Sequence, residues 1–165
     1  MRYDSFYLSE NKPFPNSTLP VIVYREVFEE EREDYGDGFL ELFIRHGWGN
    51  SWRNGIYPFH HYHAKAHEVL GCAKGWVKVQ LGGEGGKIFQ IKKGEAVLLP
   101  AGVGHCRIES SDDFSIIGAY PHGQSPDMNR GKEDYERNQE FIQKVQKPDK
   151  DPITGFINPA VKEWK

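Results

Sequence analysis

The chain has few cysteines, no excess of positive charge and no long apolar run. Its two cysteines, Cys72 and Cys106, are fewer than a small disulfide-stapled secreted domain carries, which favours buried thiols in a reducing compartment. The formal net charge of -3 argues against a general nucleic-acid binder, which needs a basic face. No stretch approaches the ~20 apolar residues that span a bilayer, and the first ten residues lack the apolar segment of a signal peptide. We therefore expect a cytoplasmic protein without a nucleic-acid or membrane partner.

Length and aromatic content favour one domain with a well-filled core. A chain of 165 residues is long enough for one domain and too short for two comfortable ones. The hydrophobic fraction is modest at 38%, but 13% of the residues are aromatic, and each aromatic side chain buries a large area. We expect a single domain over 1–165, with an N-terminal strand and helix in 20–46, a barrel core at about 55–120, and a C-terminal helix and tail in 131–165.

The segments outside the barrel core predict short helices and one strand. Proline and asparagine breakers predict irregular structure over 1–19, and the β-prone run at 20–25 predicts an edge strand, which could pair across a dimer or close its own sheet. Apolar residues at helical spacing predict helices over 37–46 and 131–145. We expect Trp164 to anchor the extended tail.

The middle of the chain has the pattern of an all-β domain. Short runs rich in Val, Ile, Phe and Tyr alternate with glycine-containing turns such as Lys74-Gly75 and 82–86, which are hairpin signals. Many short strands at even spacing indicate a sandwich or a small barrel. The predicted strands are 56–63, 67–73, 75–81, 87–92, 95–99, 104–109 and 113–120.

A histidine-rich run predicts a metal site. If 56–63 is a strand, His61 and His63 point to the same face, because side chains alternate along a strand. Glu68 follows closely, and a third histidine, His105, lies on a later predicted strand. Neutral imidazoles with one carboxylate suit Fe, Mn, Co, Ni, Cu or Zn rather than Mg or Ca. Four protein ligands on a six-coordinate ion leave two positions for water, substrate oxygens or dioxygen.

The other histidines and the cysteines near these candidate ligands are less specific evidence for a metal site. His67 and Glu68 lie on opposite faces of their predicted strand, so only one of them can face the metal. His60 and His67 either pack or orient the ligands through hydrogen bonds. Cys106 lies on the face opposite to the adjacent candidate histidine, which argues against a thiolate ligand, and Cys72 is expected in the core.

Two separated motifs resemble those of the cupin superfamily. The first has the spacing G-x5-H-x-H-x4-E-x6-G and comprises Gly55, His61, His63, Glu68 and Gly75. The second has the spacing G-x5-P-x-G-x2-H and comprises Gly94, Pro100, Gly102 and His105. Glu109 stands where the second motif usually ends in an asparagine that is not a metal ligand in the family. Segments 47–48, 52–54, 67–71, 100–105 and 118–121 resemble the uncharacterised YjlB-like branch of small single-domain cupins.

The resemblance implies an all-β fold, the double-stranded β-helix or jelly-roll barrel, here with flanking short helices. It also implies a divalent transition metal inside the barrel, such as Fe, Mn, Ni or Zn, and frequent homodimers. By motif position, the implied metal ligands are His61, His63, Glu68 and His105. The family covers many activities, so the resemblance gives the fold without a settled reaction.

Other side chains are candidates for substrate contact. Strand parity places Arg107 on the His105 face, about 7 Å further along, where a guanidinium could hold a carboxylate or phosphate. Arg107 could equally pair with Glu109 or lie at the barrel rim. Tyr120, with Tyr57 and Phe59, could line an apolar pocket or belong to the plain core. We include Arg107 and Tyr120 as candidate catalytic residues.

Three functions remain open at this point. The first is a metalloenzyme acting on a small oxygen-rich molecule, with dioxygenase-type chemistry ahead of sugar isomerisation. The second is a non-enzymatic module that binds a small-molecule ligand. The third is a metal-free barrel in which the histidines have lost their role.

Overall fold

The computed structural model describes the backbone of residues 1–165 and every side chain except that of Val161. The strands of the described chain are β1 (Arg2–Leu8), β2 (Ser17–Arg25), β3 (Trp48–Asn54), β4 (Glu68–Lys74), β5 (Trp76–Leu81), β6 (Lys87–Lys92), β7 (Ala96–Leu99), β8 (His105–Ser110) and β9 (Ser115–Pro121). The helices are α1 (Gly36–Arg45), α2 (Tyr135–Lys144) and α3 (Ala160–Glu163).

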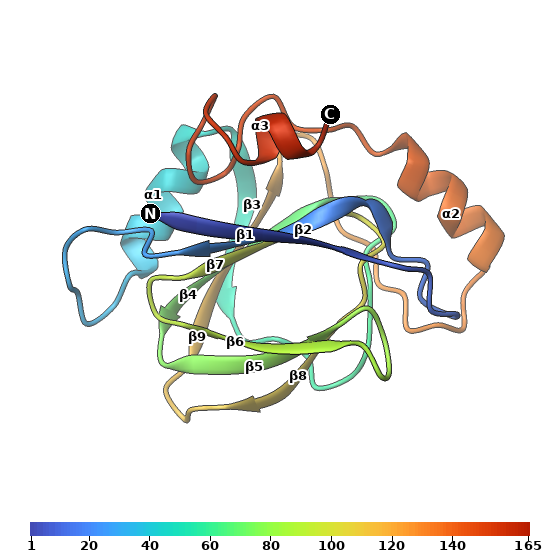
Figure 1. Ribbon diagram of the computed structural model, residues 1–165, viewed down its shortest axis with the longest axis horizontal. Helices are drawn as coiled ribbons and strands as arrows, with labels where there is room; N and C mark the ends of the chain where they lie inside the picture. The colour runs from blue at the N-terminus through green and yellow to red at the C-terminus, as the bar shows by residue number, and fades with distance from the viewer.

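The described strands pair antiparallel in two sheets, which enclose the barrel of a double-stranded β-helix (Figure 1). The larger sheet has the order β1-β2-β7-β4-β9-β3, and the smaller sheet has the order β6-β5-β8. Figure 1 shows α1 and α3 on one side of the larger sheet and the smaller sheet on the other. The all-β prediction, with short helices beside a jelly-roll barrel, is therefore confirmed.

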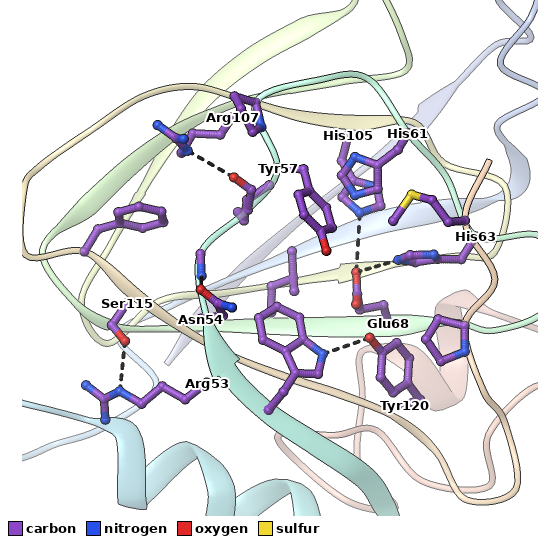
Figure 2. Close-up of a pocket in the computed structure, with 18 of the residues that line it drawn as sticks. Arg53, Asn54, Tyr57, His61, His63, Glu68, His105, Arg107, Ser115 and Tyr120 are labelled. Atoms are coloured by element: carbon purple, nitrogen blue, oxygen red, sulfur yellow. Dashed lines mark hydrogen bonds and ion pairs between the residues drawn. The ribbon is translucent and has the colours of Figure 1, made fainter. Parts of the chain in front are cut away.

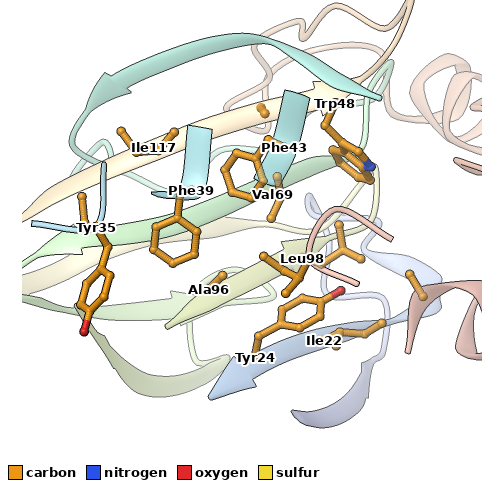
Figure 3. Close-up of a cluster of buried hydrophobic side chains, with 14 of the residues drawn as sticks. Ile22, Tyr24, Tyr35, Phe39, Phe43, Trp48, Val69, Ala96, Leu98 and Ile117 are labelled. Atoms are coloured by element: carbon orange, nitrogen blue, oxygen red, sulfur yellow. The ribbon is translucent and has the colours of Figure 1, made fainter. Parts of the chain in front are cut away.

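The central strands of the larger sheet are buried on both faces, which explains their nearly continuous apolar runs. Alternate residues face the barrel interior and meet the smaller sheet. This inner set includes Val21, Val23, Leu70, Cys72, Val97, Leu99 and Ile116 from the larger sheet and Val77, Val79 and Leu81 from β5. The remaining strand residues face α1 and the C-terminal tail (Figure 3). This outer cluster includes Ile22, Tyr24, Val69, Leu98 and Ile117 from the sheet, Phe39 and Phe43 from α1, and Trp164 from the tail.

Close packing of α1 on the sheet depends on a glycine. The ring of Phe39 lies over Gly71 of β4, where an added Cβ would come within 2.6 Å of the ring. The tail beyond α2 completes this outer layer, because Trp164 is 3% exposed and its indole Nε1 donates to the carbonyl of Pro20. The anchoring role predicted for Trp164 is confirmed.

The N-terminal segment differs from the prediction. Residues 1–19 were expected to be irregular, but β1 occupies most of the first eight residues, and it pairs only with β2 among the described strands. The prediction of 20–25 as an edge strand is wrong, because β2 lies between β1 and β7. The side chains of β1 are largely exposed, so its sequence lacks the apolar alternation by which a strand is recognised.

A second edge strand, β3, was also missed. It is mostly polar and pairs with β9 through an irregular register between Gly49 and Trp52. The helices predicted at 37–46 and 131–145 correspond to α1 and α2, of which the second begins later than expected. Among the described helices, none combines the length and the apolar character needed to cross a membrane.

Candidate metal centre

The histidine-rich run is an extended loop rather than the strand predicted at 56–63. Its backbone is held by two isolated bridges. His61 and His105 exchange backbone hydrogen bonds of 2.8 and 3.2 Å, and Tyr62 exchanges bonds of 2.9 and 3.1 Å with Asn129. The bridges keep this part of the loop extended, so alternate side chains still point the same way, as they would on a strand.

Three buried imidazoles meet at the inner end of this loop (Figure 2). One ligand atom from each of His61, His63 and His105 lies within 4.8 Å of the other two. The Nδ1 atoms contact the backbone carbonyls of Phe59, Asp127 and Val103 respectively. A carbonyl can only accept, so each Nδ1 carries a hydrogen, and in the neutral imidazole each Nε2 has the free lone pair. This tautomer presents all three Nε2 atoms to a common point.

The carboxylate of Glu68 lies beside the three imidazoles. On β4, Glu68 pairs with Leu99 and has the same parity as Leu70, so it faces the barrel interior. Its Oε1 is 3.5 Å from Nε2 of His63 and 3.4 Å from Nε2 of His105. Of the two residues that competed for the inward position, Glu68 occupies it.

Protonation in the cluster follows from burial and from the carboxylate. Burial, together with the neighbouring His105, lowers the pKa of His61 to about 3, so this imidazole is neutral at neutral pH. Burial alone would disfavour protonated His63 and ionised Glu68, but their mutual attraction raises the pKa of the imidazole and lowers that of the carboxyl well below its usual range. A cation bound at the Nε2 atoms would take the place of the proton that Glu68 draws to His63.

The remaining histidines lie away from this cluster. His60 packs edge-on against Phe14. His67 points to the opposite side of β4, where its ring packs on Trp164 and its Nδ1 accepts from the backbone N–H of Ala101. Burial lowers the pKa of His67 to about 4. Both residues have the packing role that was one of the two predicted for them, and backbone carbonyls, not these histidines, orient the three clustered imidazoles.

Both cysteines are buried thiols. Cys72 is part of the barrel core, as predicted. Cys106 precedes Arg107 on β8, and its Sγ lies 3.6 Å from the carbonyl of Arg107. Burial raises the pKa of both thiols, which makes them poor nucleophiles at neutral pH.

A cavity of about 830 Å³ opens from the cluster to the surface. The two other candidates, Arg107 and Tyr120, line it together with the clustered histidines and Glu68. Arg107 does not pair with Glu109, which contacts Lys78 at 3.5 Å. The hydroxyl of Tyr120 accepts a hydrogen bond of 2.8 Å from the indole Nε1 of Trp52 (Figure 2). Burial, reinforced by Glu68, raises the pKa of Tyr120 far above its usual value, so it keeps its proton.

The sequence analysis assigned no role in the site to two of its residues. Trp52 belongs to the missed strand β3, so its hydrogen bond to Tyr120 on β9 was not foreseen. Asp127 lies in the loop after β9; its carbonyl accepts from His63, and its carboxylate accepts from the backbone N–H groups of Ala64 and Lys65. A role carried by a loop carbonyl leaves no mark in a motif, although an aspartate that caps two N–H groups is a common loop anchor.

The donor set fits a divalent transition metal. Three imidazoles held in one tautomer, with an ionised carboxylate beside them, are the ligand types that Fe, Mn, Ni and Zn share. The motif glycine Gly102 has a φ of 98° and lies against the carbonyl of Asn16, so a side chain there would be strained and would clash. It brings the turn before His105 close to the N-terminal segment, and His105 reaches the cluster directly after that turn.

Comparison with known proteins gives one strong relative. The chain is 37% identical over 163 residues to the uncharacterised protein YjlB of Bacillus subtilis (strain 168), covering 97% of this chain and 95% of the relative. No protein-family model matches the chain.

Solved structures resemble the chain more distantly. A DUF861 family protein from Thermotoga maritima is 23% identical, with a TM-score of 0.35, over 55% of this chain and 94% of that protein. Acireductone dioxygenase from Bacillus anthracis, solved with a cadmium ion in its active centre, is 13% identical, with a TM-score of 0.40, over 76% of this chain and 81% of that enzyme. The assignment of the fold rests on the strand pairing itself.

Proposed function

This chain belongs to the YjlB family of cupins, and we propose that its barrel binds a divalent transition metal through His61, His63, His105 and Glu68. The observation that carries the proposal is the shared tautomer of the three imidazoles. Each Nδ1 is committed to a backbone carbonyl, while the ligand atoms lie within 4.8 Å of one another. Histidines that merely fill a core have no reason to present three lone pairs to one point.

We further propose that the site is catalytic and acts on a small oxygen-rich molecule. A bound ion would supply Lewis acidity or, if it is iron, a site for dioxygen. The cavity beside the cluster is large enough for a small metabolite. Dioxygenase-type oxidation is the first expectation, because nitrogen-rich ligand sets suit iron chemistry, and isomerisation of a sugar-like substrate is the second.

The protein's own groups would position the substrate and hold protons. Tyr120 keeps its hydroxyl proton next to Glu68, and Trp52 fixes the position of that hydroxyl by donating to it. The apolar side chains of Ile56, Leu70 and Phe114 line the cavity and would limit the access of water to a bound substrate. In this proposal Tyr120 is a hydrogen-bond donor at the edge of the centre rather than a base.

Metal content per chain is the first test, measured by inductively coupled plasma mass spectrometry on protein purified without chelators or nickel resin. The wild type should carry close to one transition metal per chain, and the His61→Ala, His63→Ala double variant should carry almost none. His60→Ala is the matched control, since His60 packs on Phe14 outside the cluster, and it should retain the metal. Wild-type protein that stays metal-free after reconstitution would overturn the proposal.

Turnover is the second test, run on the metal-loaded wild type with diketones, thiols, keto acids and sugar phosphates. Oxygen consumption that depends on both metal and substrate would support the dioxygenase class. Conversion that proceeds equally without oxygen would support the isomerase class. A rise in melting temperature with a ligand, without turnover of it, would leave a non-enzymatic binding module as the function.

A further inference from the structure

Arg107 and His105 face the same space because of their register on β8. His105 pairs with Leu81 of β5, and Arg107 pairs with Val79. Both partners belong to the inner core of the barrel, so both β8 side chains point inward. Figure 2 shows the guanidinium of Arg107 near one end of the cavity and the histidine cluster near the other.

The guanidinium of Arg107 is held in place but not neutralised. Its Nε donates to the carbonyl of Ile56 at 3.0 Å, and its central carbon lies 5.8 Å from the centre of the Phe114 ring. Of the carboxylates in the described chain, none has an oxygen within 4.0 Å of its nitrogens, and the neighbouring Glu109 pairs with Lys78 instead. A fixed, partly buried cation without a counter-ion attracts an anion from solution.

The second arginine of the cavity, Arg53, provides the contrast. Its Nη2 is 2.7 Å from Asp34, its Nη1 also donates to Asp34, and its Nε donates to Ser115. The charge of Arg53 is therefore balanced by a carboxylate within the protein. Two arginines line one cavity, and of these two only Arg107 has both terminal nitrogens without a hydrogen-bond partner in the described structure.

We infer that Arg107 anchors the carboxylate of a small organic acid whose other end reaches the histidine cluster. A single guanidinium beside the apolar ring of Phe114 balances one negative charge, which fits a carboxylate better than a phosphate dianion. A cavity of about 830 Å³ admits a molecule of a few carbon atoms with room to spare. The anchoring of the carboxylate rests on Arg107 alone, while the contact at the other end rests on the metal centre proposed above.

Three acids that share a 2-oxo acid end and differ at the far end test this inference. The probes are 2-oxoglutarate with a distal carboxylate, 2-oxopentanoate with a methyl group in its place, and phosphonooxypyruvate with a distal phosphate. Isothermal titration calorimetry would measure their affinities for manganese-loaded and metal-free protein. Arg107→Gln removes the anchor, Arg107→Lys keeps its charge without the planar fork, and Arg53→Gln is the matched control.

The wild type should bind 2-oxoglutarate about tenfold more tightly than 2-oxopentanoate. Arg107→Gln should reduce this preference to within about twofold, Arg107→Lys should keep part of it, and Arg53→Gln should keep all of it. Equal affinities in the wild type, or a preference that survives Arg107→Gln, would overturn the anchor. Tighter, Arg107-dependent binding of phosphonooxypyruvate would overturn the choice of carboxylate.

The manganese-free titrations separate this inference from the metal centre. A preference for the distal carboxylate that is independent of manganese and lost in Arg107→Gln supports the anchor even if no metal binds. If manganese does not change the affinity for 2-oxopentanoate, which carries only the shared 2-oxo acid end, the result counts against the metal centre and leaves the anchor intact.

Discussion

Two buried carboxylates of this barrel differ in the groups that surround them. Asp151 is fully buried, and its two oxygens accept four hydrogen bonds of 2.6 to 3.0 Å. The donors are the hydroxyl of Tyr24 and the backbone N–H groups of Ile153, Thr154 and Ala160. Glu68 is 3% exposed, and two imidazoles lie 3.4 and 3.5 Å from its Oε1.

The difference lies in the chemistry of the neighbours rather than in burial. Three of the four donors around Asp151 are backbone N–H groups, which cannot bind a metal, and the fourth, the hydroxyl of Tyr24, links the C-terminal tail to β2. The neighbours of Glu68 are imidazoles that could themselves bind a metal, beside a cavity that leads to the surface. A buried carboxylate with a complete set of neutral donors indicates a structural anchor, whereas one among imidazoles indicates a candidate site.

The largest expected effect is on stability, at the structural carboxylate. Asp151→Ala leaves four buried donors without an acceptor and should lower the free energy of unfolding by about 3 kcal/mol, measured by urea denaturation in chelator. Tyr24→Phe, which removes one of the four hydrogen bonds, should cost about 1 kcal/mol. The metal content of the folded fraction should stay at the wild-type value. Metal loss without loss of stability would reverse the roles assigned to the two carboxylates.

Metal removal should produce the next largest effect, and a smaller one where Glu68 is replaced. With free metal at about 100 times its dissociation constant, binding adds about 2.7 kcal/mol to the stability of the native state. Chelation should therefore lower the melting temperature of the wild type by several degrees and that of Glu68→Gln by about half as much or less, because a tenfold loss of affinity halves the stabilisation by metal. A wild-type melting temperature that does not change on chelation would show that the cluster contributes no metal-linked stability.

The third prediction compares Glu68, the first residue of β4, with His67 immediately before it, whose side chain points to the opposite face of the sheet. Glu68→Gln should weaken metal affinity by at least about tenfold, measured by competition with a chromophoric chelator. Its metal-free stability should change by less than about 1 kcal/mol, because a neutral amide is less costly to bury than a carboxylate. His67→Gln should keep the affinity within about twofold. The reverse order would mean that the inward register of β4 is wrong.

The sequence predicted best the strands that have a strong apolar signal. Strands β4, β7 and β9 are buried on both faces and were recognised as apolar runs, whereas β1 and β3 are edge strands with mostly polar or exposed residues. An edge strand is stabilised by backbone pairing with one neighbour, which leaves little trace in its side chains. The sequence was therefore informative about the centre of the larger sheet and weak at its edges.

The candidate site was predicted better than the local structure that forms it. The strand expected at 56–63 is absent from the described structure, yet His61 and His63 still converge, because the bridge to His105 keeps the loop extended. Parity alone also placed Arg107 toward the cavity. The carbonyl of Asp127, which orients His63, could not be predicted, since any residue in that loop offers a carbonyl and the contact spans 64 positions.

The smallest expected effect tests how far the polar surroundings of Glu68 extend. Trp52→Phe removes the hydrogen bond from the indole to Tyr120 and should cost about 1 kcal/mol of stability. Metal affinity should fall by no more than about threefold, because Glu68 and its two imidazoles remain in place. The matched control is Trp76→Phe, on the outward-facing side of β5, which should leave metal affinity unchanged. A loss as large as that of Glu68→Gln, in the same chelator competition, would mean that the indole and the tyrosine hold the carboxylate in position. Glu68 would then resemble Asp151 more closely, as a residue whose geometry depends on fixed donors.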